Sequence, residues 1–211
     1  MNISTMKPLA ILLFLASLAS AQTPAGDALP SKPGLYAMFN TSEGSITARL
    51  YEKDTPIAVQ NFVALAEGAK AWRDPKTGAM VKRPIYDNIT FHRIIPGEVI
   101  QSGDPTGTGF HNCGVTIHDE FLPGLRFSRP GRLAVANNGN PDSGGCQFFI
   151  TNDVVPRWDG KYTIFGEVVA GQEVVSRISR APAHGEKPVD PAKLISVTIQ
   201  RVGAEPKGKK K

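Results

Sequence analysis

The sequence predicts a mainly β protein, a closed eight-stranded antiparallel β-barrel capped by two α-helices. About eight short apolar runs are separated by Gly, Pro and Asp clusters, which is the rhythm of an all-β chain. Two other segments place apolar residues at helical spacing. The length of 211 residues, with 41% apolar and 20% charged residues, suits one globular domain. Small closed barrels fill their interior with side chains, so we expect a binding site on the outer face.

Residues 1–21 are predicted to be a secretory signal peptide. Lys7 precedes the apolar run 9–16, and Ala19-Ser20-Ala21 provides a cleavage site of the A-x-A kind. The apolar run is shorter than the ~20 residues that a membrane-spanning helix needs. We therefore expect an exported protein, periplasmic or secreted, with no stable membrane insertion after cleavage.

The mature chain is expected to consist of a linker, one domain and a tail. Residues 22–33 are rich in Pro, Ala, Gly and Ser, as linkers are, and residues 34–203 form the predicted domain. Only Lys7 is charged in the leader, so the formal net charge of +5 falls to +4 on cleavage. Residues 204–211 contain four lysines without interleaved aromatic residues. They are typical of a basic disordered tail, and no nucleic-acid partner is expected.

The elements of the domain follow from alternation and helical spacing. Residues 35–40 and 45–51 alternate apolar and polar side chains around Ser42-Glu43-Gly44, which predicts a hairpin. A helix is expected between Pro56 and Gly68, and a loop over residues 70–87. A second helix is expected over residues 172–178. Further strands are predicted at residues 89–94, 99–102, 132–136, 147–151, 163–169 and 194–202.

One arginine and one glutamine stand out in an otherwise apolar, β-branched run. Arg93 and Gln101 lie eight residues apart in it. An arginine is almost never fully buried without a partner, so Arg93 is expected to face a cleft. No metal or cofactor is expected, because the four histidines fall in no metal-binding spacing and the glycine-rich segment 104–109 lacks the lysine of a phosphate loop.

Three blocks together resemble the cyclophilin family of peptidyl-prolyl isomerases. They are residues 91–104, which begin Phe91-His92-Arg93-Ile94-Ile95-Pro96-Gly97; residues 135–151, from Val135-Ala136-Asn137 to Gln147-Phe148-Phe149-Ile150-Thr151; and residues 158–166. Their order and approximate spacing are those of the family, and the resemblance extends from about Gly34 to Val202. It implies the same barrel with two helices, and a non-covalent enzyme that accelerates rotation about X-Pro bonds.

The resemblance also assigns roles to individual residues. Arg93 matches the catalytic arginine, which would hydrogen-bond to the prolyl nitrogen of the twisted amide, and Gln101 matches the glutamine that positions it. The partners implied are proline-containing unfolded or flexible polypeptides, bound by a monomer without cofactors. The expected substrate-binding residues are Phe91, Glu98, Val99, Ala136, Asn137, Gln147, Phe149, Trp158 and Tyr162.

Several of these positions depart from the family pattern. Glu98 stands where an aromatic residue usually faces the substrate proline, Arg157 stands at a frequent tryptophan, and Tyr162 at a frequent histidine. Glu98 could turn outward to pair with Arg157 or could engage Arg93. These departures predict an altered pocket with reduced sensitivity to the cyclosporin type of inhibitor. Because of Glu98, they also leave a rival function open, a proline-peptide binding module or holding chaperone that isomerises weakly.

The two cysteines, Cys113 and Cys146, permit one disulfide in an exported protein. In the resembled fold both border the substrate groove. A bridge and two separate thiols, one of them packed as a small hydrophobic side chain, both remain open from the sequence.

Overall fold

The computed structural model describes residues 31–203. The predicted signal peptide, most of the predicted linker and the basic tail lie outside these residues. Within residues 31–203, no helix is both long enough and apolar enough to cross a membrane.

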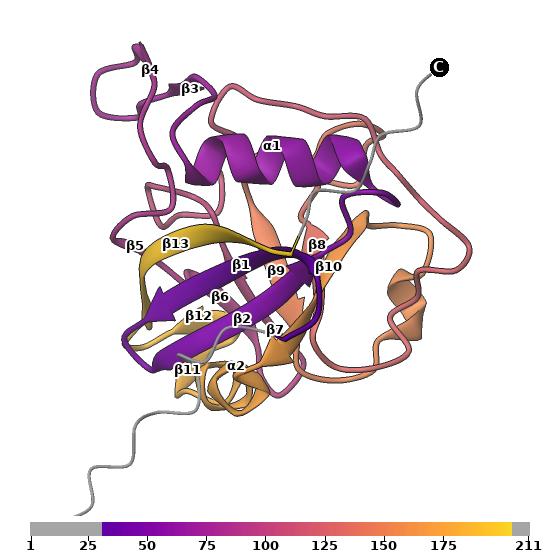
Figure 1. Cartoon of the computed structure of the whole chain (residues 1–211). Coiled ribbons are helices and arrows are strands. Elements are labelled where there is room, and N and C mark those ends of the chain that lie inside the picture. The colour runs from indigo at the N-terminus through magenta and orange to yellow at the C-terminus, as the bar shows by residue number, and fades with distance from the viewer. Residues whose placement is uncertain (1–30, 204–211) are drawn as a thin grey trace, which may run out of the picture.

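A curled nine-stranded sheet forms the body of the molecule (Figure 1). The strand order is β5-β13-β1-β2-β10-β8-β9-β7-β6, and all of its pairings are antiparallel. The bounds are β1 Gly34–Thr41, β2 Gly44–Leu50, β5 Ile89–Thr90, β6 Arg93–Ile95, β7 Val99–Ser102, β8 Arg132–Val135, β9 Phe148–Thr151, β10 Ile164–Ala170 and β13 Lys193–Val202.

The predicted mainly β fold with two helices is confirmed, but the closed eight-stranded barrel is not what forms. The run 89–94, expected as one strand, divides at Phe91 and His92 into β5 and β6. These two short strands lie at opposite ends of the strand order. The strand order is that of an open sheet with nine strands, and only two residues of chain separate β5 and β6, the strands at its two ends.

Two helices pack on the sheet from different sides, α1 above it and α2 below it in Figure 1. The helix α1 spans Pro56–Ala66 and starts with a proline in its first turn, where the missing N–H is not needed. The helix α2 spans Gln172–Ser179 and buries Val174, Val175 and Ile178. Their spacing of one, three and four residues places them on one face, as helical periodicity requires.

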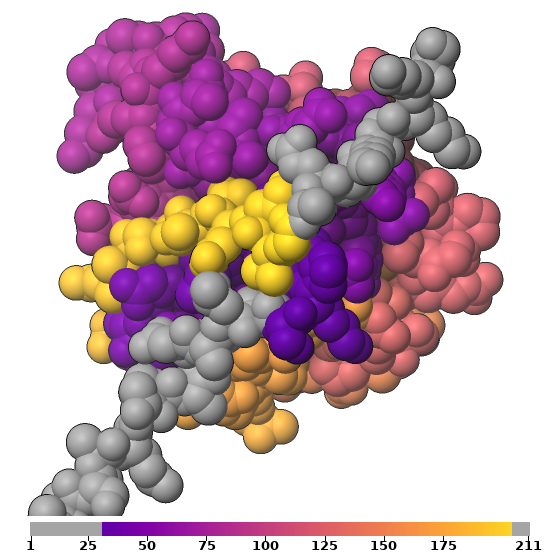
Figure 2. All heavy atoms as spheres, in the orientation of Figure 1, coloured from indigo at the N-terminus to yellow at the C-terminus, as the bar shows by residue number. Residues whose placement is uncertain are grey.

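Small elements that the sequence did not indicate complete the fold. The predicted loop 70–87 contains the two-residue strands β3 (Trp72–Arg73) and β4 (Met80–Val81), which form the lobe projecting at the upper left of Figure 2. A second minimal hairpin pairs β11 (Ala183–His184) with β12 (Lys187–Pro188). A 3-10 turn, η1, spans Pro156–Trp158.

The strand β9 separates two apolar clusters because successive side chains of a strand point to opposite faces. Phe148 enters the main core, where its ring lies 5.6 Å from that of Phe62 on α1. Phe149 enters a second cluster, in which its ring stacks against Phe127 at 5.8 Å between centroids. The second cluster lies on the face that also carries the predicted site, so one strand supports both the core and the site.

Candidate active site

The β6–β7 hairpin brings the two polar residues of the first block face to face. Arg93 and Gln101 are direct cross-strand partners, and Arg93 Nη1 donates a hydrogen bond of 2.8 Å to Gln101 Oε1. The tight turn between the strands places Gly97 at a φ of 77°, a left-handed conformation that glycine adopts without a steric penalty. The eight-residue spacing seen in the sequence is therefore the register of one hairpin.

A chain of hydrogen bonds continues from Gln101 to a neighbouring loop. Gln101 Nε2 donates to Gln147 Oε1 at 2.9 Å. Gln147 Nε2 in turn donates to the carbonyl oxygens of Gly109 and His111, at 3.0 and 3.1 Å. Each amide thus accepts from one side and donates to the other, which fixes its orientation. Arg93, Gln101 and Gln147 form a connected set, called here the polar side of the site.

An acidic residue that the sequence analysis did not single out completes the polar side. Arg93 Nε donates to Glu186 Oε2 at 2.6 Å, across 93 residues of sequence. Arg93 Nη2 makes no hydrogen bond to any residue in the described range 31–203. The guanidinium is therefore held at two nitrogens and has the third available for a ligand.

The aromatic side of the site consists of Phe149, Trp158 and Tyr162. The ring of Phe149 lies 5.3 Å from Trp158 and 5.1 Å from Tyr162, both in edge-on geometry. Trp158 and Tyr162 are 5.5 Å apart and only half-buried. Val99 packs into the same cluster. Such an arrangement provides an apolar surface with a buried aromatic floor, suitable for a compact ring such as proline.

Of the two partners considered for Glu98, Arg157 and Arg93, the structure shows Arg157. Its carboxylate forms an ion pair with Arg157 and not with Arg93. The Arg157 guanidinium also lies over the Trp158 ring, 5.2 Å from its centroid. The edge of the aromatic side is therefore an ion pair stacked on a ring, in place of the two aromatic residues that the resemblance implies there.

Ala136 and Asn137 line a cavity beside the polar side, together with Gln101, Gly109, Cys146 and Gln147. The Asn137 side chain donates to the carbonyl of Lys161 at 2.9 Å. The backbone N–H and C=O of Asn137 bond to no other residue of the described chain. This backbone can pair with an extended peptide, the role that the resemblance implies.

The prediction that Phe91 binds substrate needs correction. Phe91 has no exposed surface and packs in the main core, and its backbone N–H bonds to the carbonyl of Ala192. Its neighbour His92 is buried too, with neither ring nitrogen hydrogen-bonded within the described residues. Burial lowers the pKa of His92, which keeps the imidazole neutral at neutral pH. Both residues are buried and precede the strand that carries Arg93.

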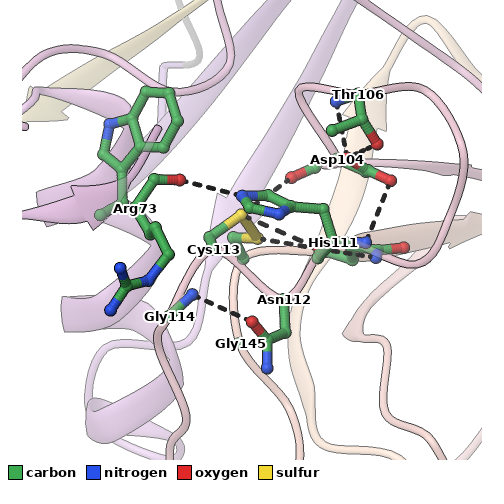
Figure 3. The surroundings of a disulfide bond; sticks show 12 residues. Arg73, Asp104, Thr106, His111, Asn112, Cys113, Gly114 and Gly145 are labelled. Atoms are coloured by element: carbon green, nitrogen blue, oxygen red, sulfur yellow. Dashed lines mark hydrogen bonds between the residues drawn. A yellow bond between two sulfur atoms is a disulfide. The ribbon is translucent and has the colours of Figure 1, made fainter. Parts of the chain in front are cut away.

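Cys113 and Cys146 form a disulfide, with their Cα atoms 6.2 Å apart (Figure 3). Of the two possibilities left open by the sequence, the bridge is the one present. Cys146 directly precedes Gln147, so the disulfide ties the loop over residues 104–115 to the strand that continues the polar side. In Figure 3 the side chain of His111 extends from this loop toward Arg73 of β3, and its Nε2 lies 2.9 Å from the carbonyl oxygen of Arg73.

Asp104 organises the first half of the same loop. Its carboxylate accepts hydrogen bonds from the backbone N–H groups of Thr106 and Gly109, at 2.7 and 2.6 Å, and from the Thr106 hydroxyl. Burial alone would raise the pKa of Asp104, but these bonds outweigh it and hold the pKa below its usual value. No group of three or more His, Cys, Asp or Glu side chains in residues 31–203 could hold a metal ion.

The chain matches known proteins over most of its length. Residues 36–199 match the profile of the family described as cyclophilin type peptidyl-prolyl cis-trans isomerase/CLD. The chain is 42% identical over 166 residues to the peptidyl-prolyl cis-trans isomerase A of Mycobacterium tuberculosis, covering 77% of this chain and 91% of the relative. It is 41% identical over 170 residues to the peptidyl-prolyl cis-trans isomerase B of Streptomyces anulatus, covering 79% and 97%.

Solved structures agree with this match. A cyclophilin type isomerase of Cryptosporidium parvum superposes with a TM-score of 0.68 at 32% identity, covering 80% of this chain and 98% of that one. Another crystal structure of that isomerase, in the presence of the dipeptide Ala-Pro, gives a TM-score of 0.67 at 31% identity, covering 79% and 99%. This chain therefore belongs to the cyclophilin family and is a peptidyl-prolyl cis-trans isomerase of the cyclophilin type.

Proposed function

We propose that this isomerase accelerates X-Pro rotation without covalent chemistry, through a hydrogen bond from Arg93 to the prolyl nitrogen. Resonance makes the X-Pro bond planar, and uncatalysed isomerisation takes tens to hundreds of seconds. When the bond twists, the nitrogen lone pair is released and becomes an acceptor. A donor that meets this lone pair stabilises the twisted state more than either planar state, which is the requirement for catalysis.

The observation that carries the proposal is the arrangement of the Arg93 guanidinium. Its Nε and Nη1 are engaged by Glu186 and Gln101, and Nη2 makes no hydrogen bond within residues 31–203. An arginine keeps its charge at all physiological pH values, so it can donate without giving up a proton. The arrangement supports a preorganised donor for charge that develops only in the twisted amide.

The rest of the site supports recognition of extended proline peptides. The ring set around Phe149 offers a surface for the proline ring, and the backbone of Asn137 is available for pairing with the peptide. The Cryptosporidium parvum isomerase studied with Ala-Pro supports the same ligand class. The substrates proposed here are flexible or unfolded polypeptides containing proline, handled by a monomer.

The proposed location is outside the cytoplasm, in the periplasm or the medium. Two observations support it: the leader-like residues 1–21 and the Cys113–Cys146 bridge, a bond that is rare in a reducing cytosol. The client proteins would then be exported chains that fold after crossing a membrane.

A holding chaperone with little turnover is the rival function. It was suggested by the acid at position 98, which could have weakened Arg93. The pairing of Glu98 with Arg157 favours the isomerase function over the chaperone function. The Glu98 carboxylate then lies at the edge of the aromatic side and does not pair with Arg93. Since the resemblance implies a tryptophan at the position of Arg157, cyclosporin-type inhibitors should bind weakly. A titration comparing wild type with Arg157→Trp checks this.

The decisive experiment measures isomerisation of an Ala-Pro tetrapeptide by wild type and by Arg93→Ala, after circular dichroism confirms that both are folded. Loss of the donor should lower kcat/KM by about 100- to 1000-fold, the range seen when one transition-state donor is removed. Arg129→Ala is the matched control, because Arg129 is also an exposed, ion-paired arginine, paired to Glu167. Unchanged turnover in Arg93→Ala would refute the mechanism.

A further inference from the structure

We propose that Glu186 is a positioning residue for Arg93, which fixes the guanidinium so that Nη2 faces the bound peptide. The inference rests on the proposed role of Arg93. Its basis is the 2.6 Å contact between Glu186 Oε2 and Arg93 Nε.

The β11–β12 hairpin delivers Glu186 to this place. Ala183 pairs with Pro188, and the turn between the strands contains Gly185 at a φ of 64°. Glu186 directly follows this glycine, and its backbone carbonyl accepts a 2.8 Å hydrogen bond from the N–H of Ile94. Glu186 therefore holds two consecutive residues of β6, Ile94 through its backbone and Arg93 through its side chain. These two contacts fix both the backbone and the side chain of Glu186 against β6.

The two partners of Arg93 act on different parts of its guanidinium. A guanidinium is planar, and a bond at Nε fixes the plane relative to the side-chain stem. The second bond, from Nη1 to Gln101 at 2.8 Å, fixes the tilt toward β7. With both in place the remaining nitrogen, Nη2, has one direction. Removing either partner would let the group rotate, and only a fraction of molecules would then present the donor correctly.

The exposure of the pair sets the expected size of the effect. The Arg93 side chain is 38% exposed and that of Glu186 is 52% exposed. Ion pairs with such access to water contribute little to folding, because solvent and salt screen them. The pair is therefore expected to affect the orientation of Arg93 more than the stability of the protein. Glu186 cannot act by keeping Arg93 protonated, since arginine stays charged regardless.

The distribution of acids around the site agrees with this assignment. Two glutamates lie near two arginines, and they pair separately, Glu98 with Arg157 and Glu186 with Arg93. Glu98 belongs to the turn that leads into the aromatic side. Glu186 belongs to the hairpin behind β6. Glu98 thus pairs at the edge of the aromatic side, and Glu186 pairs with Arg93, the proposed donor.

The test compares three variants in the mature protein: Glu186→Ala, Glu186→Gln and Asp190→Asn. Asp190 is the matched control, because it is exposed on the segment after β12 and forms no ion pair within residues 31–203. Glu186→Ala should lower kcat/KM by about two- to fivefold, the effect of losing one exposed but well-oriented pair. Glu186→Gln keeps an acceptor and should retain most activity. Asp190→Asn should equal wild type, and no variant should change the melting temperature appreciably.

A double-mutant cycle distinguishes positioning from a general structural role. If Glu186 acts through Arg93, then Glu186→Ala should cause no further loss in an Arg93→Ala background. A merely structural role would lower both backgrounds by the same factor. The Arg93 Nε–H resonance in a ¹⁵N NMR spectrum reports the contact directly and should shift in Glu186→Ala but not in Asp190→Asn.

Two results would overturn the proposal: full activity in Glu186→Ala with an unchanged Nε–H resonance, or equal losses in the two backgrounds. Either leaves the role of Arg93 intact, provided that Arg93→Ala itself is inactive. If Arg93→Ala were as active as wild type, the catalytic mechanism would fail instead. The two failures are therefore separable in one set of measurements.

Discussion

The polar side and the aromatic side of the site are built in opposite ways. On the polar side, Arg93, Gln101 and Gln147 lie in a single line of hydrogen bonds, in which every amide has a fixed donor and a fixed acceptor end. On the aromatic side, Phe127, Phe149, Trp158 and Tyr162 all contact one another, so each ring has the other three as neighbours. The polar side depends on the directions of its hydrogen bonds, and the aromatic side depends on how well its side chains fill the available volume.

This difference bears on the positions at which the resemblance implies other residues. Glu98, Arg157 and Tyr162, which stand where the resemblance implies other side chains, all lie on the aromatic side or at its edge. A surface that binds through volume tolerates new side chains if the space stays filled. A hydrogen-bonded line does not, because one changed member leaves a neighbour without a partner. We expect changes on the aromatic side to alter which peptides bind, and changes on the polar side to alter the rate.

The largest effect should come from emptying the aromatic side. Phe149→Ala removes a buried ring from the second cluster and should destabilise the protein by about 3–5 kcal/mol in chemical denaturation. Phe110→Ala is the control, because Phe110 is 93% exposed and its removal leaves no cavity. If the Phe149 variant were as stable as the Phe110 variant, the aromatic side would not depend on packing and the comparison would fail.

The next effect concerns the loop that ends the polar side. Replacing both Cys113 and Cys146 by serine opens a loop whose ends are separated by 33 positions in the sequence, and should lower the free energy of unfolding by about 3–4 kcal/mol. Denaturation of wild type with and without reductant provides the internal control. Reductant should reproduce the loss in wild type and leave the double variant unchanged. An equal response of both proteins to reductant would show that the bridge does not stabilise this loop.

The smallest effect should come from the ion pair at the aromatic edge. Glu98 and Arg157 have side chains 33% and 54% exposed, so their mutual interaction should be worth about 1 kcal/mol or less. A double-mutant cycle with Glu98→Gln and Arg157→Gln measures it in unfolding experiments. The same variants should change the relative kcat/KM of peptides that differ in the residue after proline. Identical peptide preferences in all four proteins would mean that the edge does not select substrates.

Strong local patterns in the sequence predicted much of the fold and the site. The strand 99–102 forms as predicted, and the neighbours Phe148 and Phe149 divide between core and site as alternation requires. The strand of Arg93 and that of Gln101 were both predicted from the sequence, and the structure adds the register that makes these two residues cross-strand partners. These features depend on residues that are close in sequence, where periodicity and turn chemistry decide the structure.

Contacts between segments that are distant in the chain could not be predicted from the sequence. Glu186 lies on two-residue strands, which are too short to show periodicity, and it meets Arg93 across 93 residues. The division of the run 89–94 was missed for a related reason. Its apolar residues suit one strand, but the N–H of Phe91 bonds to Ala192 and that of Ile94 bonds to Glu186, so tertiary partners decide where pairing stops.

That division also affects how the molecule meets other copies of itself. Unpaired strand edges are where chains add to one another and aggregate. Here the sheet ends on its two shortest strands, with two and three residues, and the Ile94 N–H of the terminal strand β6 is already occupied by Glu186. An incoming strand would find little backbone to pair with at either end. We therefore expect little pairing of its sheet edges with unfolded chains, among which its proposed clients would be found.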